Sequence, residues 1–326
     1  MKKILCAVLA LAAMTSCSKE YTVDYNKQAI AFGEAFVDNG TRADYSSGKT
    51  VTKFNVWGTV KGEFTGAQSV YIFNGDEVKN TGVVDGVNTT AEYGEVWFCD
   101  NIQYWVPNTN YAFTAVVDGV LSADHSKIEH TVADGNANLD LLLATATASV
   151  DEYGAVTGTY IGTNGLVKFN FNHLLSKLQF NQPTHNMAGY TVVVTGIEVA
   201  NVLDKGVYTI NGGTWAKAAD AEADVELTFS PVTGGFETRQ ILPLEQTLTV
   251  TVYYDVMIGS DKISEVVKTG TIPAQTYAQG YVYAITPQIS ATEIQFTVEK
   301  VNGWTGYDAD ADGDVDADDD ITPSVN

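Results

Sequence analysis

Carboxylate side chains near the C-terminus stand at a spacing that suits a divalent cation. Between residues 308 and 319 they occupy positions 1, 3, 5, 7, 9 and 12 of a loop, and Gly313 occupies position 6, where the chain must turn sharply. This is the spacing of an EF-hand-type calcium loop, with Asp instead of Glu in the last place. The candidate ligands are Asp308, Asp310, Asp312, Asp314, Asp316 and Asp319.

The alternative for this stretch is a solvated acidic tail, because a dense run of Asp matches many ligand positions by chance. No helical pattern brackets the loop, and Pro323 follows it closely. Should calcium bind, we expect a weak affinity, on the order of 10⁻⁴ to 10⁻³ M as in extracellular modules. Calcium is the one cofactor that the sequence suggests, and no cofactor is required elsewhere.

The rest of the chain offers few residues for catalysis. His125 and His130 lie five positions apart, which on a strand points their side chains to opposite faces. The sequence has no histidine pair at zinc spacing, no Gly-x-Ser-x-Gly elbow and no glycine-rich phosphate loop. A formal net charge of −22 makes nucleic acid a poor partner. The sequence therefore predicts neither an enzyme nor a nucleic-acid-binding protein.

The first residues predict export with a lipid anchor. Lys2 and Lys3 precede an apolar run over residues 4–14, which is too short to span a bilayer and is typical of a secretory signal. Cys17 follows two small residues where the signal would be cut, so we expect its thiol to carry lipid and to hold the chain in the outer membrane. An ordinary signal peptide with an incidental Cys17 is the alternative.

Cysteine and aromatic residues in the middle of the chain have both a structural and a functional interpretation. Cys99 lies in a strand-like stretch without a disulfide partner, so we expect it to be a small core residue. Tyr104, Trp105, Tyr111 and Trp215 could stack against sugar rings if they were exposed, which is the basis of a glycan-binding alternative. For the first three we favour burial between strands, where aromatic residues are common.

The elements that must position these residues are strands. Short segments of alternating apolar and polar residues are separated by Gly, Asn and Asp, and no long helical period occurs, so we expect an all-β sandwich architecture. Apolar residues fall on odd positions up to Phe171 and on even positions from Leu178. This change requires a bulge, or a strand that leaves one sheet, near His173 and Leu174. The polar stretch 181–189 is expected to be a linker between two domains.

Several short segments stand in a characteristic order and spacing along nearly the whole chain. They are the signal ending at Cys17, Ala29-Ile30-Ala31-Phe32, Thr41-Arg42-Ala43, Phe54-Asn55-Val56-Trp57-Gly58, Tyr104-Trp105, Asp140-Leu141-Leu142-Leu143-Ala144, the run 167–178, Gly206-Val207-Tyr208, Ile241-Leu242-Pro243, Gly280-Tyr281-Val282-Tyr283, Ile294-Gln295-Phe296-Thr297-Val298 and Trp304. Together they resemble the fimbrillin family, the lipoprotein-precursor pilins of type V pili. The calcium-like tail is not part of that pattern.

The resemblance implies two tandem transthyretin-like β-sandwich domains. On this basis the chain divides into a lipoprotein signal peptide, a leader, an N-terminal sandwich, a C-terminal sandwich and an acidic tail. The bounds are residues 1–17, 18–42, 43–187, 188–306 and 307–326.

The resemblance also implies processing by an Arg-specific protease and assembly by strand exchange. Arg42 ends a turn-rich stretch that favours cleavage, which would leave Ala43 at the new N-terminus. The cut would release a placeholder strand, whose groove a strand from the next subunit then fills. The residues proposed to fill the first domain before the cut are Ile30, Phe32, Phe36 and Val37.

The expected partners follow from this interpretation. They are other pilus subunits, outer-membrane lipid through Cys17 before processing, and a host or bacterial surface receptor. Three alternatives stay open at the level of sequence: an anchor subunit that keeps its leader, a monomeric lipoprotein with an ordered leader, and a surface glycan-binding lipoprotein.

Overall fold

Strands dominate the structure, a computed structural model of the chain, and more than a third of the chain lies in them, as expected. The predicted signal peptide with Cys17, the predicted processing residues Arg42 and Ala43, and the acidic tail lie outside the described residues. The structure describes residues 28–37, 53–79, 83–84, 87–88, 97–136, 139–162 and 165–301.

The largest sheet has eight strands in the order β1-β11-β9-β7-β2-β3-β6, with β10 paired to β9. Every pairing in it is antiparallel except that of β1 with β11, which is parallel. Its strands are β1 (Phe32–Val37), β2 (Lys53–Gly62), β3 (Val70–Lys79), β6 (Phe98–Cys99), β7 (Thr109–Val117), β9 (Leu142–Val150), β10 (Val156–Thr159) and β11 (Val167–His173).

Two further sheets face each other in the second half of the chain. One has five strands: β12 (Ser176–Phe180), β13 (Thr184–His185), β20 (Arg239–Ile241), β23 (Val282–Ile289) and β24 (Ile294–Val301). The other has four strands: β14 (Thr191–Leu203), β17 (Ala223–Phe229), β21 (Glu245–Ile258) and β22 (Asp261–Thr276).

Smaller elements complete the fold. A three-stranded sheet is formed by β8 (Lys127–Thr131), β15 (Lys205–Thr209) and β16 (Thr214–Lys217). There are also two small sheets of two strands each. One pairs β4 (Val83–Val84) with β5 (Val87–Asn88), and the other pairs β18 (Pro231–Val232) with β19 (Gly235–Phe236). The 3₁₀ turns are η1 (Glu63–Thr65) and η2 (Asp134–Asn136). No helix among the residues that the structure describes is long and apolar enough to cross a membrane.

Alternating burial explains why these segments form strands. In β11 Val167, Phe169 and Phe171 are fully buried, whereas Lys168 and Asn170 between them are half-buried. Such a period of two places one set of side chains on the core face of a sheet. The all-β class and the sandwich architecture that the sequence predicts are confirmed.

The predicted change of parity near His173 is confirmed and has a structural cause. β11 belongs to the eight-stranded sheet, but β12, only three positions further on, belongs to the five-stranded sheet. The chain therefore passes between sheets at Leu174 and Leu175, both fully buried. Within the stretch 181–189, which the sequence predicts to be a linker between two domains, Thr184–His185 pairs in parallel with β23.

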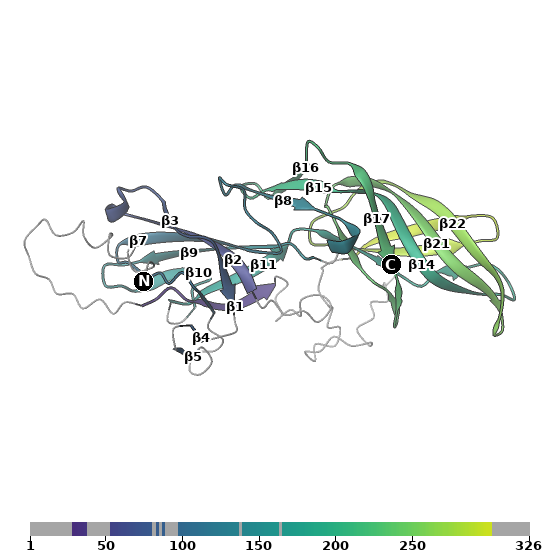
Figure 1. Cartoon of the computed structure of the whole chain (residues 1–326), viewed down its shortest axis with the longest axis horizontal. Helices are drawn as coiled ribbons and strands as arrows, with labels where there is room; N and C mark the ends of the chain where they lie inside the picture. Colours follow the sequence, from purple (N-terminus) through teal and green to yellow (C-terminus); the bar gives the residue numbers. More distant parts are fainter. Residues whose placement is uncertain are drawn as a thin grey trace, which may run out of the picture.

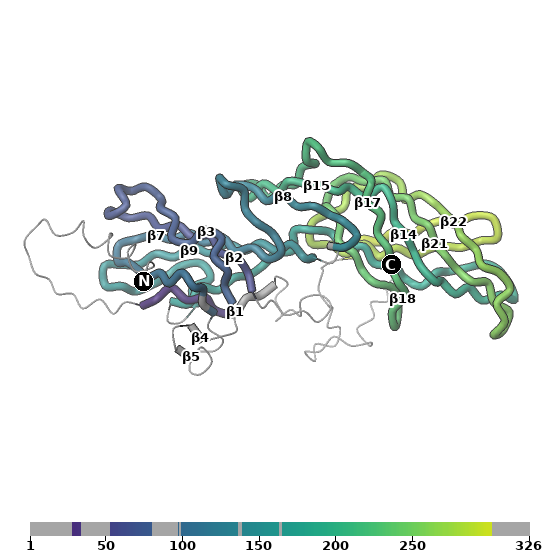
Figure 2. Tube along the Cα trace, viewed as in Figure 1, coloured from purple at the N-terminus to yellow at the C-terminus, as the bar shows by residue number. Residues whose placement is uncertain are grey.

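Two hydrophobic cores lie along an elongated molecule (Figure 1). One lies on the eight-stranded sheet. The other lies mainly between the five- and four-stranded sheets and also includes Trp57, Val116 and Leu143 of the eight-stranded sheet. The strands β14, β17, β21 and β22 form the right end of the molecule in this view. Between the two cores β8, from the first half of the chain, pairs antiparallel with β15, from the second half (Figure 2). The count of two tandem domains and their bounds stay predictions.

Candidate functional site

Residues 28–37, called here the N-terminal segment, run between two edges of the eight-stranded sheet. Their first half pairs with the stretch 97–105, where the Ile30 amide donates to Gln103 O at 2.8 Å and the Trp105 amide donates to Gln28 O at 3.1 Å. Their second half is β1, which pairs with β11. The segment therefore lies against β11 at one end of the strand order and against the continuation of β6 at the other.

Phe32 is the point at which both edges meet. Its amide donates to Trp97 O at 3.0 Å, and the Trp97 amide donates to Phe32 O at 2.8 Å. One residue earlier, Ala31 O accepts from the Val167 amide of β11 at 2.9 Å. The segment closes the sheet with backbone hydrogen bonds that a sheet edge would otherwise leave open to another chain.

The side chain of Phe32 fills the centre of the first core. It is 0% exposed, and its ring centroid lies 5.6–6.3 Å from those of four other phenylalanines. These rings come from β2, β3, β7 and β11, and three of the four pairs meet edge to face, a favourable arrangement for aromatic rings. They belong to Phe54, Phe73, Phe113 and Phe169.

The structure brings the four residues of the predicted placeholder strand onto this one segment. Ile30 is 4% exposed and belongs to the same core as Phe32. Phe36 and Val37 lie on β1, where their backbone pairs with Asn170 and Phe171. Whether the segment is a placeholder stays a prediction.

The aromatic residues of the glycan-binding alternative do not form an exposed platform. Trp105 and Tyr111 are buried in the first core, with ring centroids 4.7 Å apart and edge to face. Trp215 is half-buried and donates its indole N–H to Leu174 O at 2.8 Å. Tyr104 is exposed, contrary to the expectation of burial, because alternation along 101–106 turns it outward while Trp105 turns inward.

A comparison with known protein families decides what this architecture is. The profile described as "Fimbrillin-like" matches residues 41–304, most of the chain. The chain belongs to the fimbrillin-like family. It is a family of structural fimbrial proteins and adhesins of the cell surface, not of enzymes. No functionally curated protein matches the sequence.

Solved structures share the fold of this fimbrillin-like chain at low sequence identity. A fimbrial protein from Bacteroides vulgatus is 14% identical, with a TM-score of 0.53, and the match covers 85% of this chain and 99% of that one. A proposed cell adhesion protein from Bacteroides ovatus is 15% identical, with a TM-score of 0.54, and the match covers 85% of this chain and 98% of that one.

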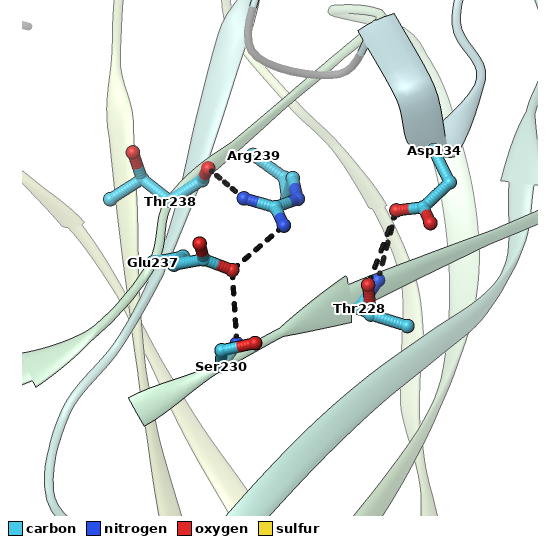
Figure 3. A network of polar contacts seen from close by, with 6 residues as sticks. All are labelled: Asp134, Thr228, Ser230, Glu237, Thr238 and Arg239. Carbon is cyan, nitrogen blue, oxygen red and sulfur yellow. Dashed lines mark hydrogen bonds and ion pairs between the residues drawn. The ribbon is translucent and has the colours of Figure 1, made fainter. Parts of the chain in front are cut away.

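The sequence holds two arginines, and the fimbrillin-like fold protects the second. Arg239 is 8% exposed on β20, and its backbone pairs with Leu178. Its guanidinium donates to Glu237 Oε2 at 2.9 Å and to Thr238 O at 3.1 Å (Figure 3). The Ser230 amide donates to the same Glu237 oxygen and, with the guanidinium, lowers the pKa of Glu237. A paired strand with a buried side chain is a poor protease substrate.

Cys99 is a core residue, as the sequence predicts. It is 6% exposed, and burial raises the pKa of its thiol to about 12, so it is a poor nucleophile at neutral pH. Its Sγ donates to Asn101 O at 3.1 Å. Over the described ranges no three His, Cys, Asp or Glu residues gather as a metal site.

A buried polar cluster that the sequence did not reveal lies where the chain passes between sheets. His173 Nδ1 and Asp140 Oδ1 are 2.9 Å apart, and both residues are buried. Lys177 is buried nearby, and desolvation lowers its pKa to about 8 although Asp140 acts to raise it. The three residues come from separate parts of the fold, so no local sequence pattern predicts that they lie close together.

Trp97 is the other residue that sequence reasoning missed. It holds both backbone hydrogen bonds of Phe32 and is itself 2% exposed. The pair joins positions far apart in the chain, and only the sheet brings them together.

Proposed function

We propose that the chain is a fimbrial subunit whose N-terminal segment is a placeholder strand, exchanged during assembly for a strand of another subunit. The observation that supports this most is the position of the segment, which closes two sheet edges and fills the core beneath them with Phe32. A cut after Arg42 would sever the segment from everything that follows while leaving it held by non-covalent contacts alone.

The physical chemistry of the vacated site favours a new strand. Loss of the segment would uncover apolar surface around Phe54 and Phe169. It would also remove the partners of the Trp97 amide and carbonyl and of the Val167 amide. An extended strand from another subunit restores both the hydrogen bonds and the apolar burial.

The N-terminal anchor fits the same sequence of events. Lipid on Cys17 would hold the precursor in the outer membrane until the cut releases the mature chain from its leader. Since anchor and segment lie on the same side of Arg42, one cut would release both.

Limited proteolysis of the native protein with an Arg-specific enzyme tests the proposal. We expect one cut, a new N-terminus at Ala43, and oligomers on size-exclusion chromatography once the segment has left. Arg42→Lys is the matched control, because it keeps the charge but removes the recognised residue. Arg239 is an internal control, which we expect to be cut only after unfolding in urea. An Arg42 that resists cutting, or a cut protein that keeps its segment and stays monomeric, would contradict the proposal.

A further inference from the structure

The backbone pairing of the N-terminal segment is irregular. Backbone hydrogen bonds alone therefore discriminate little between strands of other subunits that could replace the segment. β1 is the one parallel strand among the described strands of its sheet, and its register with β11 shifts between Phe32 and Ala35. Parallel pairing is slightly less stable per residue than antiparallel pairing, and backbone hydrogen bonds are the same for any sequence.

Side-chain contacts, in contrast, are concentrated at Phe32. Four aromatic rings on four strands surround this one side chain, and the Trp97 backbone fixes its position along the strand. We use the name acceptor site for these four rings, Phe54, Phe73, Phe113 and Phe169, together with the Trp97 backbone. A site built from rigid rings cannot close around a smaller side chain without leaving a cavity.

The neighbouring positions add size limits. Ile30, two residues before Phe32, is buried in the same core. Gly33 is buried as well, and a Cβ added there would lie 3.2 Å from Cγ of Lys168. This contact is tight, so a β-branched residue after the aromatic one would push against Lys168.

We infer that the acceptor site selects an incoming strand by one aromatic side chain at the position of Phe32, preceded two residues earlier by a branched aliphatic side chain and followed directly by glycine or a similarly small residue. The inference rests on the proposed function, since it names the kind of strand that replaces the segment. The partner is an extended strand of another subunit with this pattern, and subunits without the aromatic residue are rejected.

Synthetic peptides test the inference on a chain that is cut independently of Arg42. In a variant, the recognition sequence of a different site-specific protease replaces residues 38–42, and this variant is cut with that protease. Fluorescein-labelled peptides are then added, which bind the acceptor site in place of the cut segment. One peptide copies residues 28–37, and the others carry Phe32→Ala, Gly33→Val, or an exchange of Gln28 and Phe32 that keeps the composition. Fluorescence anisotropy gives the affinities.

We expect the copy to bind, and the Phe32→Ala and exchanged peptides to bind more weakly by on the order of 100-fold. The Gly33→Val peptide should also bind more weakly than the copy. Equal affinity for the copy and the Phe32→Ala peptide, or no binding of the copy, overturns the inference. If this selectivity holds but the protein cut after Arg42 does not oligomerise, the assembly proposal fails and the selectivity of the acceptor site stands.

Discussion

Phe32 combines complete burial, four ring contacts and two backbone hydrogen bonds in one residue of the N-terminal segment. Large side chains in rigid surroundings contribute most to stability, because the cavity left by a smaller residue does not collapse. The segment should therefore stabilise the uncut chain mainly through this side chain.

Replacing Phe32 by Ala should lower the free energy of unfolding of the uncut chain by about 3–5 kcal/mol, the usual loss for a buried Phe. Phe64→Ala is the matched control, since Phe64 is 50% exposed and its loss should change stability by no more than about 0.5 kcal/mol. Urea unfolding measures the free energy of unfolding of both variants. Similar losses for the two variants would show that Phe32 does not anchor the segment.

His130 should make the protein sensitive to mild acid. Burial lowers the pKa of its imidazole from 6.5 to about 4, so the unfolded chain takes up a proton at a higher pH than the folded chain. The stability contributed by the neutral side chain is complete above pH 6.5 and is lost as the pH falls through 4. Between pH 7 and 5, urea unfolding should show a fall in stability that His130→Gln reduces. An equal loss of stability in the wild type and in His130→Gln would mean that other titratable groups cause the acid sensitivity.

At the scale of the element, β11 and the stretch 97–105 hold the N-terminal segment between them. Cys99 lies in the same core as Phe32, two residues after its partner Trp97, and its buried thiol reports on whether that core is closed. Local opening of a core raises the access of reagents to groups that the folded chain protects.

Departure of the N-terminal segment should therefore make Cys99 reactive. In a chain that begins at Ser18, Cys99 is the one cysteine, so its modification by a thiol reagent can be followed directly. We expect slow reaction in the uncut protein and faster reaction after the cut and removal of the segment. Adding back a peptide that copies residues 28–37 should slow it again. Unchanged reactivity after removal would mean that the core stays closed without the segment.

At the scale of the whole molecule, two cores are joined by strand pairing between β8 and β15 and by buried residues at the passage from β11 to β12. A formal charge of −22 on this elongated fold favours solubility and repels other copies, so contacts between subunits must come from local surfaces rather than from net charge. A cation bound to the acidic tail would reduce that repulsion.

We propose that the tail binds calcium through the carboxylates of residues 308–319. Millimolar calcium should then raise the melting temperature by mass action, and the double change of Asp308→Ala and Asp312→Ala should abolish the rise. Sodium chloride at equal ionic strength is the control for simple screening. The same shift in both proteins would favour a solvated acidic tail.

The sequence by itself determined the strand class, the core role of Cys99 and the break in alternation after β11, because each depends on side-chain alternation within a few residues. Its segments also indicated the fimbrillin-like family. Whether that break in alternation is a bulge or a passage between sheets was decided by the tertiary structure. Only the tertiary structure decided that Phe32 meets Trp97, that the passage between sheets precedes the polar stretch 181–189, and that Trp105 is buried while Tyr104 is exposed. These outcomes depend on which strands pair. Pairing joins distant residues through backbone groups that are alike at every position, so no local pattern specifies it.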